Sequence, residues 1–251
     1  MSPHPLGLLM PHPPAIVAGI GKHERQVATA TIKACESAAD QISAFQPDSL
    51  ILITPHGPVF KDAVALMATP NLAGDFSRFG APTVGYSAPV DLALARAVQQ
   101  EARSAGLPMI SLDAAEASQY RIRPELDHGA LVPLWFLSRI IETPIPILHL
   151  TYGMLPGHVL FKIGQAIRRA ADHIGRRVVF IASGDLSHRL LADGPYGFDP
   201  AGPTLDRQIV QALSGNWQDQ ADKLAELFRL PHETLDPVSY THLTLPTKRI
   251  V

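Results

Sequence analysis

The order of apolar and polar stretches along the chain predicts strands and helices that follow one another in turn. Short, continuously apolar runs bounded by proline, glycine or polar residues are typical of strands buried on both faces of a sheet. Such runs occupy residues 6–10, 49–54, 63–68, 145–152 and 177–183, with residues 107–113 as a further candidate. Apolar residues at helical spacing predict helices at residues 23–45, 89–106, 130–141 and 156–175, and one or two helices at residues 203–229.

This alternation indicates one layered α/β/α domain with a mostly parallel or mixed central sheet. Residues 69–89 are rich in glycine and proline and predict a long loop. Because loops of that length are usually functional or mobile, we expect it to shape or cover a site. In open α/β sheets, ligands bind beyond the carboxyl ends of the strands, so we expect the site there.

Composition narrows the class of protein. Of the 251 residues, 46% are hydrophobic and 18% are charged, which predicts a sizeable core. The formal net charge is −2 and the chain has no basic tract, which argues against nucleic acid as a partner. It also lacks an apolar run long enough to cross a bilayer, so we predict a cytoplasmic protein with no membrane partner. The single cysteine, Cys35, allows no internal disulfide bond.

Two predicted strands end in the same motif, P-H-x-P. The first motif spans residues 11–14 with His12, and the second spans residues 55–58 with His56. Prolines restrict the backbone beneath each imidazole, and a metal ligand must be held in one orientation. Both histidines are therefore candidate metal ligands, suited to iron, zinc, copper or nickel. The alternative is that they are turn residues that only cap the strands.

A third predicted strand runs into "SGDLSH", residues 183–188. Its small residues allow a ligand to approach the backbone closely. A neutral imidazole with an ordinary pKa is the usual acid or base near neutral pH, so His188 is a candidate for proton transfer. The alternative is that Asp185 and Ser187 cap a helix whose first turn contains His188.

The remaining histidines carry weaker signals. His128 lies in "ELDHGALVPLWF", where Asp127 can cap the following helix and the histidine can be a bystander. His149 lies inside an apolar strand and is predicted to be a core residue with a satisfied side chain. Surface positions are predicted for His4, His23, His158, His173 and His232.

Together, five motifs resemble the class III extradiol dioxygenase family, of the type of the protocatechuate 4,5-dioxygenase beta subunit. These are "MPHPP" (10–14), "TPHGP" (54–58), "GDFSRFGAP" (74–82), "LDHGALVPL" (126–134) and "ASGDLSH" (182–188). With "YGFDPAGPTLD" (196–206), the spacing is most similar to the dioxygenase-like domain of AmmeMemoRadiSam system proteins, which are related to Memo. A second domain often follows such domains.

The resemblance implies a mononuclear non-haem Fe(II) site. His12 and His56 would be two of its three protein ligands, and the third would be a glutamate near the C-terminus. His188 would be the catalytic acid and base, and His128 would hydrogen-bond the substrate or bound oxygen. The substrate-binding candidates from the same motifs are Asp127, Ser183, Asp185 and Phe79.

The end of the chain departs from this family. After Pro237 it reads "VSYTHLTLPTKRIV", which continues neither a helical nor an alternating pattern and looks like translated sequencing adapter. We therefore expect a C-terminally truncated domain at residues 1–237 and a non-native tail at residues 238–251 that packs poorly. We assign no third ligand, and we expect the chain as written to bind iron weakly or not at all. The alternative is a genuine tail.

The leading interpretation is cleavage of a catechol-like aromatic ring with O2, with Fe(II) as cofactor and zinc as the alternative metal. A second hypothesis is a non-catalytic, Memo-like accessory module that binds a metal or ligand in an AmmeMemoRadiSam system. A third is a zinc-dependent hydrolase. The expected partners are a small aromatic substrate and O2, while a homo-oligomer or partner proteins of the system stay open.

Overall fold

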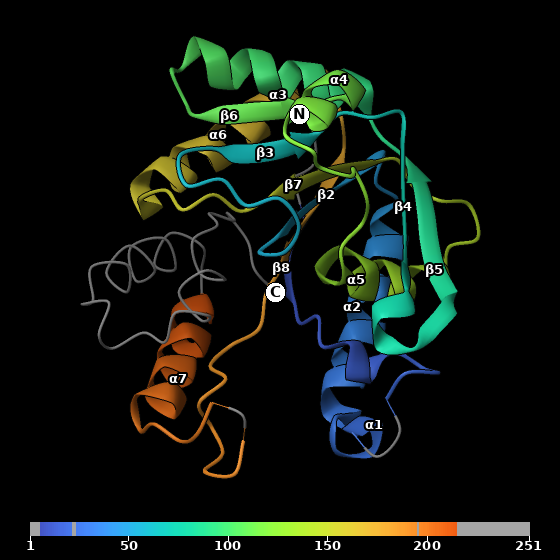
Figure 1. Cartoon of the computed structure of the whole chain (residues 1–251), viewed down its shortest axis with the longest axis vertical. Helices are drawn as coiled ribbons and strands as arrows, with labels where there is room; N and C mark the ends of the chain where they lie inside the picture. The colour runs from blue at the N-terminus through green and yellow to red at the C-terminus, as the bar shows by residue number, and fades with distance from the viewer. Residues whose placement is uncertain (1–5, 22–23, 195, 215–251) are drawn as a thin grey trace.

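The computed structural model describes residues 6–21, 24–194 and 196–214, and its core is a six-stranded sheet covered by helices (Figure 1). The strands are β1 (Leu6–Met10), β2 (Ser49–Thr54), β3 (Val64–Met67), β6 (Met109–Leu112), β7 (Ile147–Thr151) and β8 (Val178–Ser183). They lie in the order β1-β8-β2-β7-β3-β6. The first four in this order are parallel, whereas β3 pairs antiparallel with β7 and parallel with β6. The predicted α/β class with a mostly parallel or mixed sheet is confirmed.

Helices pack on both faces of this sheet. The helices are α1 (Glu24–Val27), α2 (Thr29–Phe45), α3 (Leu92–Ser104), α4 (Ala114–Gln119), α5 (His128–Ser138), α6 (Gly157–His173) and α7 (Ala201–Leu213). Apolar side chains of α2 and α5 share one core cluster with one face of the sheet, and those of α3 and α6 share a second cluster with the other face. Among the described residues, no helix is long and apolar enough to cross a membrane.

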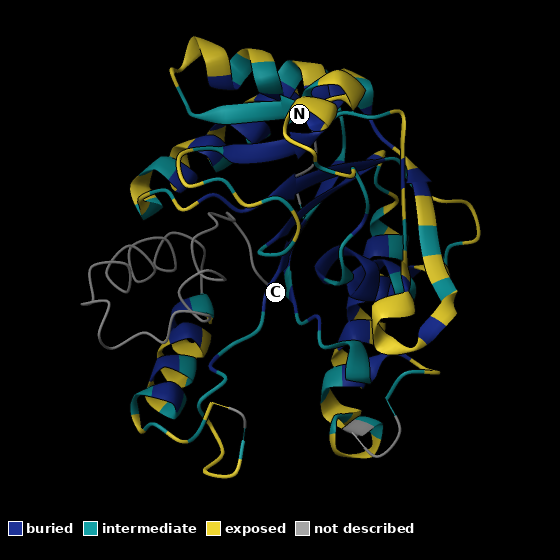
Figure 2. Ribbon diagram, viewed as in Figure 1, coloured by how far each residue is buried: buried dark blue, intermediate teal, exposed yellow. Residues whose placement is uncertain are grey.

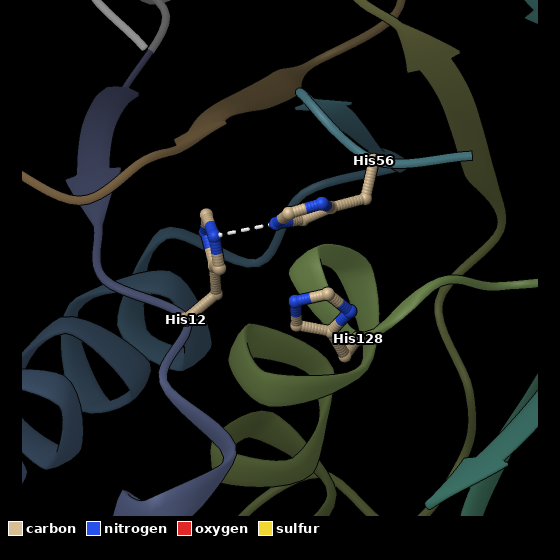
Figure 3. Close-up of side chains that lie close together, drawn as sticks. All are labelled: His12, His56 and His128. Atoms are coloured by element: carbon tan, nitrogen blue, oxygen red, sulfur yellow. Dashed lines mark hydrogen bonds between the residues drawn. The ribbon is translucent and has the colours of Figure 1, made fainter. Parts of the chain in front are cut away.

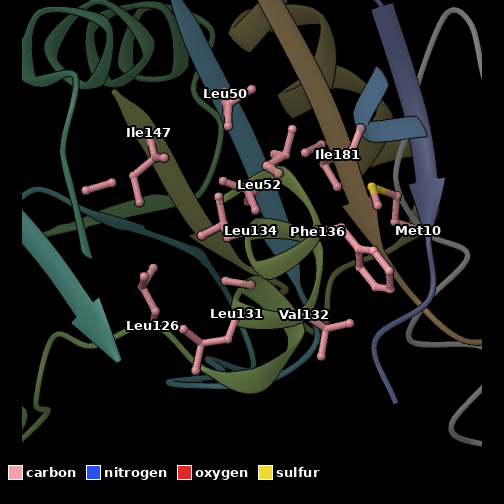
Figure 4. Packing of buried hydrophobic residues seen from close by; sticks show 14 of the residues in the cluster. Met10, Leu50, Leu52, Leu126, Leu131, Val132, Leu134, Phe136, Ile147 and Ile181 are labelled. Carbon is pink, nitrogen blue, oxygen red and sulfur yellow. The ribbon is translucent and has the colours of Figure 1, made fainter. Parts of the chain in front are cut away.

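Burial on two faces explains the continuous apolar runs. Every residue of β2 and of β7 is buried, and Figure 2 shows the inner strands of the sheet in the dark blue of buried residues. Between the sheet and α5, side chains such as Leu52, Leu134 and Phe136 fill the core (Figure 4). Full burial of one such side chain is worth about 1.5–3 kcal/mol, so α5 is held firmly against the sheet.

The prediction of a long loop at residues 69–89 is wrong. The segment folds as an antiparallel hairpin of β4 (Asn71–Phe76) and β5 (Ala81–Pro89), joined by the short 3₁₀ helix η2 (Ser77–Phe79). Two of its three glycines, Gly74 and Gly85, serve close packing, and Gly80 supplies the positive φ of 78° that ends η2. A Cβ atom at Gly74 would lie 2.3 Å from the carbonyl oxygen of Leu126, and one at Gly85 would lie 2.7 Å from the carbonyl oxygen of Gly74.

Two predicted helices have different bounds. The helix predicted at residues 23–45 is divided into α1 and α2, because the Thr29 hydroxyl donates to the Gln26 carbonyl and competes with the helical hydrogen bonds there. The helix predicted at residues 203–229 begins earlier, as α7, and its part beyond residue 214 lies outside the described residues. The predicted non-native tail, residues 238–251, also lies outside them and stays a prediction.

Candidate metal centre

His12 and His56 meet beyond the carboxyl ends of two parallel strands. His12 follows β1 and His56 follows β2, and β8 lies between these strands in the sheet. The two side chains point toward each other, with their Nε2 atoms 3.0 Å apart (Figure 3). Parallel neighbours bring their carboxyl ends to one edge of the sheet, which is why two motifs 44 residues apart in the chain converge.

His128 joins this pair from the first residue of α5. Its ring centroid lies 3.9 Å from that of His56 and 5.5 Å from that of His12. Each of the three residues offers a ring nitrogen, and these atoms lie within 4.8 Å of one another. Among the described residues, this is the one set of three potential metal ligands that comes so close together. No carboxylate belongs to the set.

The imidazole of His12 is held on several sides. The side chain is buried, and its Nδ1 lies 2.9 Å from the Ser183 hydroxyl. The His12 backbone N–H donates to Oδ1 of Asp185 at 3.0 Å. Both partners come from the end of β8 and the residues that follow it, so this segment fixes the backbone and the ring of His12 together.

Asp185 also links His12 to His188. Its Oδ2 lies 3.6 Å from Nε2 of His12 and 3.9 Å from Nε2 of His188. The His188 side chain is 27% exposed, and its ring packs against Tyr196 at a centroid distance of 5.3 Å. His188 lies outside any helix, so the alternative in which it begins a helix is wrong.

Asp127 lies behind the histidines and connects three elements. Its Oδ1 accepts from the Ala130 N–H and caps α5, as the sequence predicted for this residue. Its Oδ2 accepts from the Thr54 hydroxyl at 2.7 Å and lies 3.2 Å from Nε2 of His149. His149 is fully buried in β7, as predicted for a core histidine, but its Nδ1 has no hydrogen-bond partner among the described residues, so the prediction of a satisfied side chain is only partly confirmed.

The surroundings favour charged Asp127 and neutral imidazoles. Burial raises the pKa of Asp127, but the hydrogen bonds and charge of His149, the Thr54 hydroxyl and the charge of His56 outweigh it and hold that pKa well below its usual value. Burial lowers the pKa of His56 despite the nearby carboxylates. Burial and then the charge of His56 lower the pKa of His128 to about 4. Imidazole binds metals in its neutral form, so both rings are ready to act as ligands at neutral pH.

An aromatic side chain borders the three histidines. Phe79, from η2 of the hairpin, is 40% exposed, and its ring centroid lies 5.2 Å from that of His128. The sequence predicted that residues 69–89 would shape the site, and this contact shows how the segment reaches it, although as a hairpin. An exposed phenyl ring next to a polar cluster can pack against an aromatic ligand.

The structure therefore sorts the predicted site residues into two groups. His12, His56, His128, Asp185 and Phe79 lie around one point, and His188 reaches it through Asp185. The polar atoms of Asp127 and Ser183 contact other protein groups behind the histidines, and their predicted contact with a substrate stays a prediction. The sequence analysis gave Thr54 no role although it begins the TPHGP motif; this residue ends β2 two residues before His56, and its hydroxyl donates to Asp127.

The residues present fit a bound metal ion. The Nε2 atoms of His12, which is buried, and His56, which is half-buried, lie 3.0 Å apart and can share one ion. His128 offers a third nitrogen nearby. Imidazole donors suit iron, zinc, copper and nickel, so the donor set alone does not select the metal. The glutamate that the sequence resemblance implies is assigned to no residue of this chain and stays a prediction.

With this fold and site, the chain belongs to the family of the catalytic LigB subunit of aromatic ring-opening dioxygenase, whose profile matches residues 6–242. The predicted membership of the class III extradiol dioxygenase family is confirmed. Similarity to the AmmeMemoRadiSam subgroup stays a prediction.

Two curated relatives illustrate the range of the family. Protein CA_C1420 of Clostridium acetobutylicum is 35% identical over 205 residues, which cover 82% of this chain and 44% of the relative. A 2,3-dihydroxyphenylpropionate/2,3-dihydroxicinnamic acid 1,2-dioxygenase of Escherichia coli is 28% identical over 163 residues, which cover 61% of this chain and 47% of the relative. The chain thus spans about half the length of the curated relatives it matches.

Proposed function

We propose that this chain is a non-haem Fe(II)-dependent dioxygenase that opens a catechol-like aromatic ring with O2. The observation that carries the proposal is the 3.0 Å approach of the His12 and His56 Nε2 atoms at the strand ends of a LigB-family fold. Family membership favours iron among the metals that imidazole binds. The E. coli relative that acts on 2,3-dihydroxyphenylpropionate supports a catechol with a side chain as the substrate class.

In this proposal, His12 and His56 hold the ion. Bound Fe(II) would supply a Lewis acid and a template for the substrate and O2. Phe79 packs against the substrate ring, next to His128. His128 donates a hydrogen bond to a substrate oxygen, and its lowered pKa keeps the ring neutral, with one N–H to donate.

His188 moves the protons. Its imidazole accepts a proton from a substrate hydroxyl, and Oδ2 of Asp185, 3.9 Å away, stabilises the imidazolium that forms. The same group then returns the proton as a general acid. A positioned acid or base of this kind contributes about 10²- to 10⁴-fold to a rate.

The test uses the 251-residue chain, purified without oxygen and supplied with excess Fe(II) or Zn(II). O2 uptake is followed with catechol, protocatechuate and 2,3-dihydroxyphenylpropionate, and a ring-opened product is sought by absorbance and mass spectrometry. Uptake that requires Fe(II) and a catechol supports the proposal. Iron binding without uptake would favour an accessory module, and Zn(II)-dependent hydrolysis of esters or amides would favour a hydrolase; either result overturns the proposal.

A further inference from the structure

Ser183, the last residue of β8, makes two short contacts inside the protein. Its Oγ lies 2.5 Å from the carbonyl oxygen of Gly129 and 2.9 Å from Nδ1 of His12. Ser183 and His12 are each 2% exposed, and Gly129 is buried. Solvent has little access to these contacts, so the hydrogen of each contact must come from one of the two groups that make it.

The Gly129 carbonyl is available because of a proline in α5. In a regular helix, the carbonyl of residue 129 accepts from the N–H of residue 133, but Pro133 has no N–H to give. A serine hydroxyl has one proton, and a carbonyl oxygen can only accept. Two oxygens 2.5 Å apart need a proton between them, so the Ser183 hydroxyl donates to Gly129.

The direction of the second contact follows from the first. With its only proton directed to Gly129, the Ser183 oxygen can act toward His12 only as an acceptor, so Nδ1 of His12 carries the hydrogen. In the neutral ring, Nε2 then holds the lone pair, and this atom is the one that faces Nε2 of His56 at 3.0 Å. In the metal-free protein, His56 must donate its Nε2 hydrogen across that distance.

We propose that Ser183 is a positioning residue that fixes the Nδ1–H tautomer of His12 and so presents the Nε2 lone pair where His12, His56 and His128 converge. The part of this inference that concerns a metal rests on the proposed function, whereas the tautomer does not. Groups that hold the other nitrogen of a metal-binding imidazole set its tautomer and ring orientation. Here one hydroxyl also ties the end of β8 to the first turn of α5, which carries His128.

The first test is the tautomer itself. The 251-residue chain is labelled with ¹⁵N-histidine, kept metal-free, and examined by two-bond ¹H–¹⁵N correlation, which distinguishes Nδ1–H from Nε2–H rings. We expect His12 as Nδ1–H and His56 as Nε2–H. Addition of Zn(II), a diamagnetic probe, should move the His56 hydrogen to Nδ1 and leave that of His12 in place. A His12 ring in the Nε2–H form would overturn the proposal.

The second test is metal affinity, measured by competition with a chelating dye. Ser183→Ala should weaken Zn(II) and Fe(II) binding about 10- to 100-fold, the usual effect of losing such a partner, and should leave His12 as a mixture of tautomers. Ser183→Thr keeps the hydroxyl and should restore both the tautomer and most of the affinity. If Ser183→Ala fails to fold, the threonine variant and the wild-type spectrum still decide the matter.

Ser49→Ala is the matched control. Ser49 is also a fully buried strand serine with one hydrogen bond, to Asp91, but it begins β2, at the amino end of the strand. Its loss should lower stability without changing metal affinity. Equal losses of affinity in Ser49→Ala and Ser183→Ala would overturn the proposal. A wild-type chain with His12 as Nδ1–H that binds no metal would overturn the proposed function but support the role of Ser183.

Discussion

Replacing Asp127 by asparagine should destabilise the protein, because the carboxylate makes buried contacts with residues far away in the sequence. The carboxylate accepts from Thr54 and Ala130 and lies 3.2 Å from Nε2 of His149. The asparagine side chain has the same shape but only one acceptor oxygen. Its NH₂ group must therefore replace one of the two carboxylate oxygens that accept hydrogen bonds in the wild type. Asparagine caps helices about as well as aspartate, so we expect the loss of stability to come from the contacts with Thr54 and His149 and not from the cap. Hydrogen bonds to a charged group are worth about 1.5–3 kcal/mol, and we expect a loss of about 2–3 kcal/mol.

The assay is urea unfolding at pH 7, followed by far-ultraviolet circular dichroism. Asp113→Asn is the matched control, because Asp113 caps α4 through the N–H groups of Ala115 and Glu116. Asp113→Asn should change the free energy of unfolding by close to zero, since it affects only the helix cap. Equal effects of the two substitutions would refute the reasoning.

The same variant changes how stability depends on pH. The pKa of Asp127 is lowered in the folded protein, so its contribution is fully present above the unfolded value of about 4 and is lost as pH falls through the lower, folded pKa. Asp127→Asn removes this contribution. Stability of the variant should therefore fall less steeply with acid than that of the wild type, and parallel curves would contradict the assignment.

Further predictions concern the metal and the substrate. His12→Ala and His56→Ala should each abolish the Fe(II) binding seen when the chain is titrated with excess metal, whereas His158→Ala, an exposed histidine on α6, should not; a site variant that binds Fe(II) as the wild type does would remove that residue from the ligand set. His188→Ala should lower kcat by at least about 100-fold and leave the iron content unchanged, because its proposed role is proton transfer; loss of iron would make it a ligand. Phe79→Ala should raise KM for catechols more than it lowers kcat, and an unchanged KM would show that the ring does not contact substrate.

The histidines at the strand ends were the part of the site that could be predicted best from the sequence. A repeated P-H-x-P motif after two apolar runs was enough to single out His12 and His56, because proline and a buried strand both restrict the backbone. The position of β8 between the two strands, which brings "SGDLSH" to the same edge, depends on long-range pairing that no local pattern encodes.

The contacts of Ser183 and Asp127 could not be predicted from the neighbouring sequence. Both residues were expected to contact substrate because they belong to motifs of the family resemblance. Their partners lie far away in the chain: Ser183 contacts a carbonyl 54 residues distant, and Asp127 contacts a hydroxyl 73 residues distant. One signal was present: Pro133 inside a helical pattern meant that the Gly129 carbonyl would need a donor from elsewhere.

The hairpin at residues 71–89 was missed for a different reason. Its buried positions are few, and its glycines were interpreted as signs of a flexible loop. Gly74 is required because the Leu126 carbonyl presses against the strand, and this contact exists only in the folded protein. Composition alone does not distinguish a glycine that permits close packing from one that permits motion.

Incorporation of ¹⁸O₂ in a single turnover tests the central claim most directly. The 251-residue chain, loaded with Fe(II) and given one equivalent of a catechol, should yield a ring-opened product that carries two ¹⁸O atoms, and His12→Ala treated identically should yield none. If the iron-loaded wild type binds the catechol but leaves the ring closed, or if the product carries no ¹⁸O, then this chain is not a ring-opening dioxygenase.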